Sequence, residues 1–183
     1  ITARTRIVLL YGRFLSRIRF FVITKSGFST LRLFFSRCIF CRDTQRYKAG
    51  EAIYTRPVDH FLEEIDNCIE LGFREIFDDS GTFPVGKWLE EFCEKMVRSG
   101  RNKRIVLGCN MKPVKLNYKM MGEAGFRFIL VGIESANQHT INEIQKGQRN
   151  EDIIPIIKSM ADGGLYPHVT TMFGYLFESD EDA

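Results

Sequence analysis

Apolar residues recur at helical spacing in the stretch that follows Pro57. Acidic residues occupy the other faces of the same stretch, so the pattern predicts an amphipathic helix. Pro57 suits the first turn of such a helix, and Gly72 ends the pattern. The apolar positions on the predicted face are Val58, Phe61, Leu62, Ile65 and Ile69.

The order of helix, glycine and strand then repeats along the chain. The glycines that end the helices are Gly72, Gly100, Gly125 and Gly163. The strands that follow them are predicted at 74–77, 105–109, 126–133 and 169–175, and the later helices at 88–97, 116–124, 138–146 and 152–162. Such βαβ repeats predict an α/β fold with parallel strands and right-handed crossovers. Periodicity alone does not separate an open, doubly wound sheet from a barrel.

Pro155 lies within the last predicted helix. Proline has no backbone N–H and is tolerated in the first turn of a helix. The helix is therefore expected to begin near Asp152.

Composition is that of a soluble globular protein, with 44% hydrophobic and 27% charged residues among 183. No run of about eighteen apolar residues is present, so no membrane span is predicted. The net charge of +3 is unevenly distributed, because residues 1–42 carry nine basic residues and no acidic one. The remainder is acidic, which gives no reason to propose nucleic acid as a partner.

This charge pattern divides the chain into a basic, acid-free segment of uncertain origin, residues 1–36, and a domain over residues 37–183. An arginine-rich segment without acidic residues is typical of a transit peptide or a membrane-surface helix. The alternative is that the segment is not a natural part of the domain, as in a sequence read in a wrong frame.

The five cysteines are spread through helix-like and strand-like segments, which predicts free thiols in a reducing, cytoplasmic setting. Cys38 and Cys41 form a CxxC pair. By spacing alone this pair fits zinc ligands, iron–sulfur ligands, a redox dithiol or two structural thiols. Cys68, Cys93 and Cys109 are interpreted as small buried hydrophobic residues.

Polar residues follow the predicted strands, where the chemistry of parallel α/β folds gathers. Asp78 and Asp79 could bind an amine, a ribose or a metal, or could cap the next helix. Glu134 ends a nearly continuous apolar strand, where a carboxylate is costly unless it is paired. The alternative is that Ser135 or Asn137 caps the next helix and Glu134 points to solvent.

The order of these segments resembles the radical SAM superfamily, and most of all its branch that is often joined to a cobalamin-binding domain. The resemblance covers roughly residues 36–183. It is carried by CIFC at 38–41, EIFDDSGTF at 75–83, GCNMK at 108–112, VGIES at 131–135, IQKG at 144–147 and MFGY at 172–175.

The resemblance implies a partial (βα)6 barrel with parallel strands, incomplete at both ends in this chain. It implies a 4Fe-4S cluster and S-adenosylmethionine, whose reductive cleavage starts radical chemistry on a substrate that the sequence does not identify. A flavodoxin or ferredoxin would supply the electron, and cobalamin would enter through a domain outside this chain.

Residue by residue, Cys38 and Cys41 match the second and third cluster cysteines, and Phe40 matches the aromatic residue beside the adenine. The remaining matches face the cofactor from strand ends: Asp78 and Asp79 at the methionyl amino group, then Asn110, Glu134, Ser135 and Gly174.

Two positions depart from the family pattern. Phe34 stands where the first cluster cysteine is expected, and Leu176 stands where a proline is usual. The strand that precedes the cluster in the family is not recognisable. The alternative function is therefore a non-catalytic barrel remnant that has lost the cluster, and a third reading is a zinc-binding CxxC protein.

Overall fold

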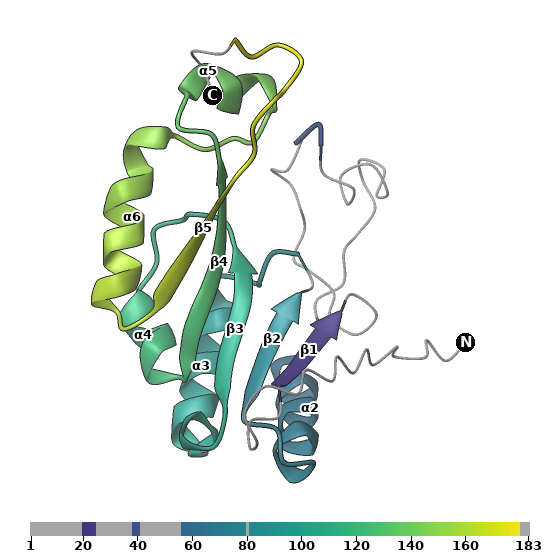
Figure 1. The fold of residues 1–183 in the computed structure, drawn as a ribbon. Coiled ribbons are helices and arrows are strands. Elements are labelled where there is room, and N and C mark those ends of the chain that lie inside the picture. Colours follow the sequence, from purple (N-terminus) through teal and green to yellow (C-terminus); the bar gives the residue numbers. More distant parts are fainter. Residues whose placement is uncertain (1–19, 25–37, 41–55, 80, 180–183) are drawn as a thin grey trace.

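The computed structural model of the chain describes residues 20–24, 38–40, 56–79 and 81–179. They form a five-stranded parallel sheet with the order β1-β2-β3-β4-β5, shown in Figure 1. The strands are β1 (Phe20–Thr24), β2 (Glu75–Asp79), β3 (Val106–Met111), β4 (Phe126–Glu134) and β5 (Tyr166–Thr171). Sequential neighbours joined by helical crossovers are the arrangement of a partial barrel, which confirms the predicted fold class.

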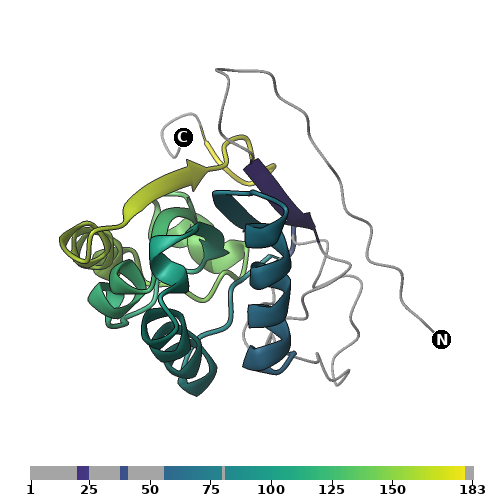
Figure 2. The same cartoon turned by 90° about the horizontal axis from the view of Figure 1, so that it is seen from below.

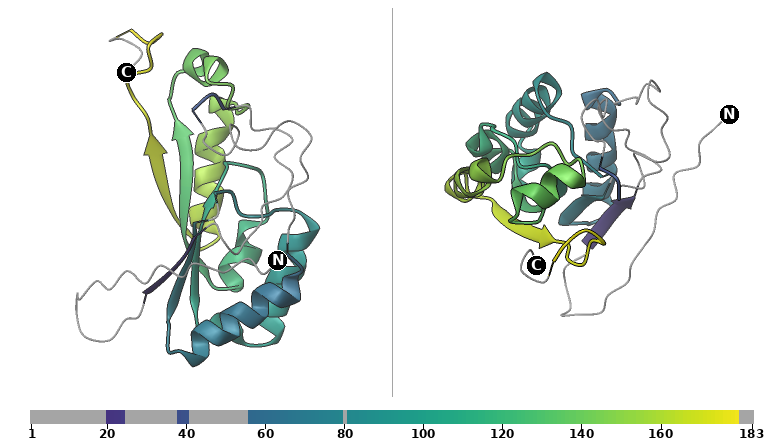
Figure 3. Two further views of the ribbon diagram at one scale, coloured as in Figure 1. Left: turned by 90° about the vertical axis from the view of Figure 1, so that its right-hand side faces the viewer. Right: turned by 90° about the horizontal axis from the view of Figure 1, so that it is seen from above.

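The helices that connect the strands lie on one side of the sheet and form an arc around it (Figures 2 and 3). These are α2 (Val58–Glu70), α3 (Lys87–Arg98), α4 (Tyr118–Glu123) and α6 (Asn150–Asp162), with a short 3-10 turn, η1 (Arg101–Lys103), after α3. A further helix, α5 (Gln138–Glu143), lies beyond the carboxyl end of β4. None of the helices in the described part of the chain is long and apolar enough to cross a membrane.

The core fills the space between the sheet and this layer of helices. Alternate strand residues such as Ile76, Leu107 and Ile129 face the helices and are buried. Phe92 of α3 packs between Phe61 of α2 and Phe126 of β4, with ring centroids 5.1 and 5.9 Å apart. This core holds the strands rigidly, so the residues at their carboxyl ends are positioned by the fold.

The sheet begins inside the basic segment, because residues 20–24 form β1. This strand pairs with β2 in parallel register, from Phe20 opposite Glu75 to Thr24 opposite Asp79. The strand is not recognisable from the sequence, since basic residues flank the short apolar stretch. The boundary between residues 36 and 37 stays a prediction.

Two other predicted elements begin earlier than expected. The last strand starts at Tyr166 instead of residue 169, and Pro167 lies within it because β5 has a single partner in the described sheet. Helix α6 begins at Asn150, which places Pro155 in its second turn and not its first. The carbonyl of Glu151 therefore loses its intrahelical N–H partner.

Candidate functional site

The start of the CxxC segment lies at the carboxyl ends of the last two strands. The backbone N–H of Ile39 donates to the carbonyl of Ile144 at the end of α5, over 3.1 Å. The ring of Phe40 packs against Tyr175, which follows β5, with centroids 6.3 Å apart. Cys38 is 3% exposed. Cys41 and Phe34 lie outside the described residues.

Glu134 occupies an irregular position at the end of β4. The β4–β5 register shifts between Gly132 and Glu134, and Glu134 has a φ of 63°, which non-glycine residues seldom adopt. Its carbonyl accepts from the N–H of Met172 over 2.8 Å, so the strand pairing continues past the bulge. Such irregularities change the direction in which a side chain points. Here they direct the carboxylate of Glu134 inward, and the residue is only 7% exposed.

Lys146 neutralises that carboxylate. Its Nζ lies 2.5 Å from Glu134 Oε1, and the whole residue is buried. The ammonium also lies 5.9 Å from the centroid of the Phe40 ring. A carboxylate, an ammonium and an aromatic face therefore meet beside the CxxC segment.

The end of α5 places Lys146 in this position. Gln145 has a φ of 53°, its N–H donates to Asn142, and the N–H of Lys146 donates to the carbonyl of Ile141. This is the Schellman arrangement that ends many helices. It reverses the chain directly after α5, so the next side chain points back toward β4.

The ion pair also explains why position 132 is a glycine. A Cβ at Gly132 would stand 2.5 Å from Glu134 Oε1 and 3.1 Å from Lys146 Nζ. The carboxylate of Glu134 and the ammonium of Lys146 therefore lie directly against the backbone of β4 at Gly132.

Replacing Gln145 by glycine is expected to stabilise the protein by about 0.5–1 kcal/mol, because glycine adopts a positive φ without steric cost. Denaturant unfolding of the purified chain measures this. Glu143→Gly is the matched control, since Glu143 lies within α5 and glycine there should destabilise by about 1 kcal/mol. Equal losses in both variants would contradict the assignment of a helix-ending role to Gln145.

Glu178 holds the segment that follows β5. Its Oε2 accepts from the N–H groups of Gly174 and Tyr175, both over 3.0 Å. Its Oε1 accepts from the buried hydroxyl of Thr140 in α5, over 3.1 Å. These three bonds tie the MFGY segment to α5 and keep Tyr175 against Phe40.

Of the two adjacent aspartates, only Asp79 shares a face of the sheet with Asn110. Asn110 Nδ2 donates to Asp79 Oδ1 over 2.9 Å on the side away from the helices. Asp78 is 4% exposed and lies on the helix-covered side near Cys109. Neither aspartate caps α3, which begins after Gly86.

The Asp79–Asn110 pair and Glu134 lie at different levels of the sheet. Asn110 is opposite Leu130 in the β3–β4 register, and Glu134 is four residues further along β4. At the rise of a β-strand this separates the two levels by roughly 13 Å along the strand direction. The carboxyl ends of the strands therefore present two polar groups at different heights along the strand direction.

Ser135 and Asn137 organise the turn into α5. Ser135 Oγ accepts from the N–H of Asn137, and Asn137 Oδ1 accepts from the N–H of His139. The capping function that the sequence allowed for Asn137 is confirmed. The expectation that came with it, a solvent-facing Glu134, is wrong because Lys146 pairs with this carboxylate inside the fold.

The other described cysteines are buried in the core, as the sequence predicted. Burial raises the pKa of Cys93 to about 12, and burial with the nearby Glu64 raises that of Cys68 to about 11. Burial, Asp78 and Cys93 raise the pKa of Cys109. These thiols stay protonated near neutral pH and are poor metal ligands there. Within the described part of the chain, no cluster of three or more His, Cys, Asp or Glu side chains is arranged to hold a metal ion.

Ionisation of these thiols should make stability depend on alkaline pH. The folded-state pKa values lie above the ordinary value of 9.0, so the stability they contribute is intact below pH 9 and is lost as pH rises toward 12. Urea unfolding from pH 8 to pH 11 should show a decline that is shallower in Cys93→Ala. An identical pH dependence in the variant would contradict the raised pKa of Cys93.

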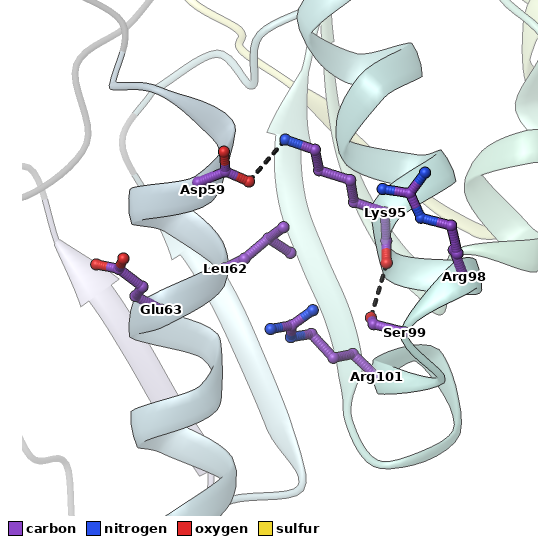
Figure 4. A pocket seen from close by; sticks show the side chains of 7 residues that line it. All are labelled: Asp59, Leu62, Glu63, Lys95, Arg98, Ser99 and Arg101. Carbon is purple, nitrogen blue, oxygen red and sulfur yellow. Dashed lines mark hydrogen bonds and ion pairs between the residues drawn. The ribbon is translucent and has the colours of Figure 1, made fainter.

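Two clefts lie near the helices. One, of ≈ 390 Å³, lies between α2 and α3 on the outer surface (Figure 4) and is lined by Asp59, Leu62, Glu63, Lys95, Arg98, Ser99 and Arg101. Its cations are paired, for example Lys95 with Asp59 over 2.6 Å and Arg101 with Asp66 over 2.5 Å. The other, of ≈ 330 Å³, lies between the loop after β3 and the start of α6 and includes Lys146. Lys146 thus joins this cleft to the Glu134 site.

A match to a protein family identifies the superfamily of this chain. The family model of the Radical SAM superfamily matches residues 35–183, well over half of the chain. The chain belongs to the radical SAM superfamily. Its sequence has no match among curated proteins.

Solved structures of OxsB and of methylornithine synthase (PylB) are among those similar to this chain. Apo, selenomethionine-labelled OxsB, a cobalamin-dependent S-adenosylmethionine radical enzyme, matches with a TM-score of 0.64 and 15% identity over 84% of this chain and 24% of that one. OxsB with aqua-cobalamin bound gives a TM-score of 0.65 and 16% identity, over 82% and 23%. Methylornithine synthase (PylB) gives 0.59 and 14%, over 84% and 44%. At these identities the likeness shows the fold, and the chain spans about a quarter of OxsB and under half of PylB.

Proposed function

We propose that this radical SAM chain binds S-adenosylmethionine at the carboxyl ends of its strands, beside a 4Fe-4S cluster, and starts radical chemistry on a substrate still to be identified. The observation that carries the proposal is the position of Cys38–Phe40. This segment contacts α5 and Tyr175 and lies beside the Glu134–Lys146 pair, although more than ninety residues separate it from them in the sequence.

The strand ends offer groups that suit a zwitterionic nucleoside ligand. Asp79 and Asn110 supply a carboxylate and an amide on the open face of the sheet. Glu134 and Lys146 supply one charge of each sign, and Gly132 leaves the space in which they lie. Tyr175 has a buried hydroxyl that lacks a hydrogen-bond partner within the described part of the chain. We assign S-adenosylmethionine contacts to Phe40, Asp79, Asn110, Glu134, Ser135 and Gly174, and leave Asp78 to the core.

For the cluster, Cys38 and Cys41 are the two thiolates that the sequence provides in the required segment, and Phe34 stands at the position of the first cluster cysteine. When bound, the reduced cluster supplies the electron that cleaves S-adenosylmethionine. We propose a flavodoxin or ferredoxin of the cytoplasm as the donor of that electron. Since OxsB is a cobalamin-dependent enzyme, we assign cobalamin to a domain outside residues 1–183.

Anaerobic reconstitution with iron and sulfide tests the cluster proposal. Thiolate-to-iron charge-transfer absorbance and bound iron should be low in the chain as written and should rise severalfold in Phe34→Cys. Phe35→Cys is the matched control, because it adds a thiol one position away from the required spacing. Equal iron binding by the two variants, or none by either, would exclude a cluster site at Cys38 and Cys41.

Phe34 also favours a second candidate, a non-catalytic barrel that has lost the cluster. Calorimetry with S-adenosylmethionine in the absence of iron shows whether such a barrel still binds the nucleoside or has lost the binding pocket as well. Heat of binding without iron would show that the nucleoside pocket persists independently of the cluster. Absence of that heat would exclude this second candidate as a nucleoside-binding barrel, and absence of heat in reconstituted, iron-loaded Phe34→Cys as well would refute the proposed ligand.

A further inference from the structure

Tyr175 carries a hydroxyl whose hydrogen-bonding capacity is unused. The hydroxyl oxygen is buried and has no hydrogen-bond partner among the residues that the structure describes. Burying such a group without a partner destabilises a protein, and native structures seldom retain one without a reason. By contrast, the buried hydroxyl of Tyr118 donates to the carbonyl of Val114.

The surroundings hold this side chain in place. Its ring stacks on Phe177, with centroids 5.5 Å apart and an interplanar angle of 13°. The ring also packs against Phe40 of the CxxC segment. Glu178 holds its backbone N–H. Three contacts therefore fix the orientation of Tyr175, and none of them involves its hydroxyl group.

The hydroxyl is a hydrogen-bond donor at neutral pH. Partial burial and the nearby carboxylates of Glu134 and Glu178 raise the pKa of Tyr175 to about 12. Because Lys146 compensates one of these two carboxylates, the described groups around the hydroxyl carry a net negative charge. An anionic acceptor would be repelled here, whereas a neutral acceptor would not.

We propose that the Tyr175 hydroxyl donates a hydrogen bond to a neutral acceptor in the nucleoside half of bound S-adenosylmethionine, a ring nitrogen or a ribose oxygen. This inference rests on the proposed function. The contact between Tyr175 and Phe40 places the hydroxyl next to the CxxC segment. The unpaired donor costs stability in the free protein, and the ligand removes that cost when it binds.

Tyr175→Phe tests the proposal by two opposite effects. Thermal unfolding of the full chain without ligand should shift upward by about 2–6 °C, since the orphaned hydroxyl is gone. Calorimetry should show S-adenosylmethionine and 5′-deoxyadenosine binding about three- to tenfold more weakly. Any heat from methionine as a separate probe should be unchanged.

Tyr118→Phe is the matched control, because it removes a hydroxyl that has a partner. Its melting temperature should fall, and its affinity for S-adenosylmethionine should stay the same. A lower melting temperature in Tyr175→Phe, unchanged ligand affinity, or weakened methionine binding in place of 5′-deoxyadenosine binding would each overturn the inference while the proposed function stands. Absence of any S-adenosylmethionine binding by the parent chain would overturn both.

Discussion

Replacing Lys146 by methionine is expected to lower the free energy of unfolding by about 3–5 kcal/mol. The variant leaves the carboxylate of Glu134 buried without its counter-ion, next to the aromatic ring of Phe40. Methionine keeps the length of the side chain, so little of the loss comes from packing. The penalty arises because the fold still withdraws a charge from water and no longer compensates it.

Chemical denaturation with far-UV circular dichroism measures this effect. Lys119→Met is the matched control, because Lys119 is exposed and lies 3.9 Å from Glu123, and its replacement should change stability by less than about 0.5 kcal/mol. The double variant Lys146→Met/Glu134→Leu should recover much of the lost stability, since no buried charge remains. A single variant as stable as the control would show that the pair is not buried in solution.

Much of the fold was predictable because hydrophobic spacing and glycine positions repeat along this chain. Four glycines mark the ends of helices, and the first three strands that follow them were located to within two residues. The last strand was predicted at 169–175, but β5 starts at Tyr166 and ends at Thr171, so the MFGY segment follows it. The strand β1 was not predictable, since five residues between Arg19 and Lys25 carry no periodicity. It joins the sheet through backbone pairing with β2, a tertiary interaction that a local pattern does not encode.

The candidate site was predictable where a strand ends in a polar residue. Glu134 stood out because a long apolar run precedes it, and its partner Lys146 did not. Lys146 was noted only within the IQKG segment, and Gln145 gives no glycine signal for the helix end that turns Lys146 inward. Adjacent residues of a strand face opposite sides, and that rule could have separated Asp79 from Asp78 before the structure was known.

The close approach of two backbone segments was not predictable from the sequence either, and Gly122 is the main example. It lies within α4, where a glycine costs helix stability, so sequence alone predicts that alanine would stabilise the protein by about 1 kcal/mol. The structure predicts the opposite sign. A Cβ at Gly122 would stand 2.1 Å from the carbonyl oxygen of Gly163, and one at Gly163 would stand 2.7 Å from the backbone of Tyr118. The two segments are in contact without side chains between them.

Gly122→Ala is therefore expected to destabilise the protein by about 3 kcal/mol and to lower its melting temperature by roughly 6–12 °C. The methyl group must push α4 away from the end of α6, and α6 precedes β5, which leads into the segment of Tyr175. Gly164→Ala separates this clash from backbone strain. Gly164 has a φ of +82° and no atom within 4 Å of an added Cβ, so its replacement should cost only about 1–2 kcal/mol. If Gly122→Ala instead raised the melting temperature, the helix preference of alanine would outweigh the contact, and α4 and α6 would not be packed backbone to backbone.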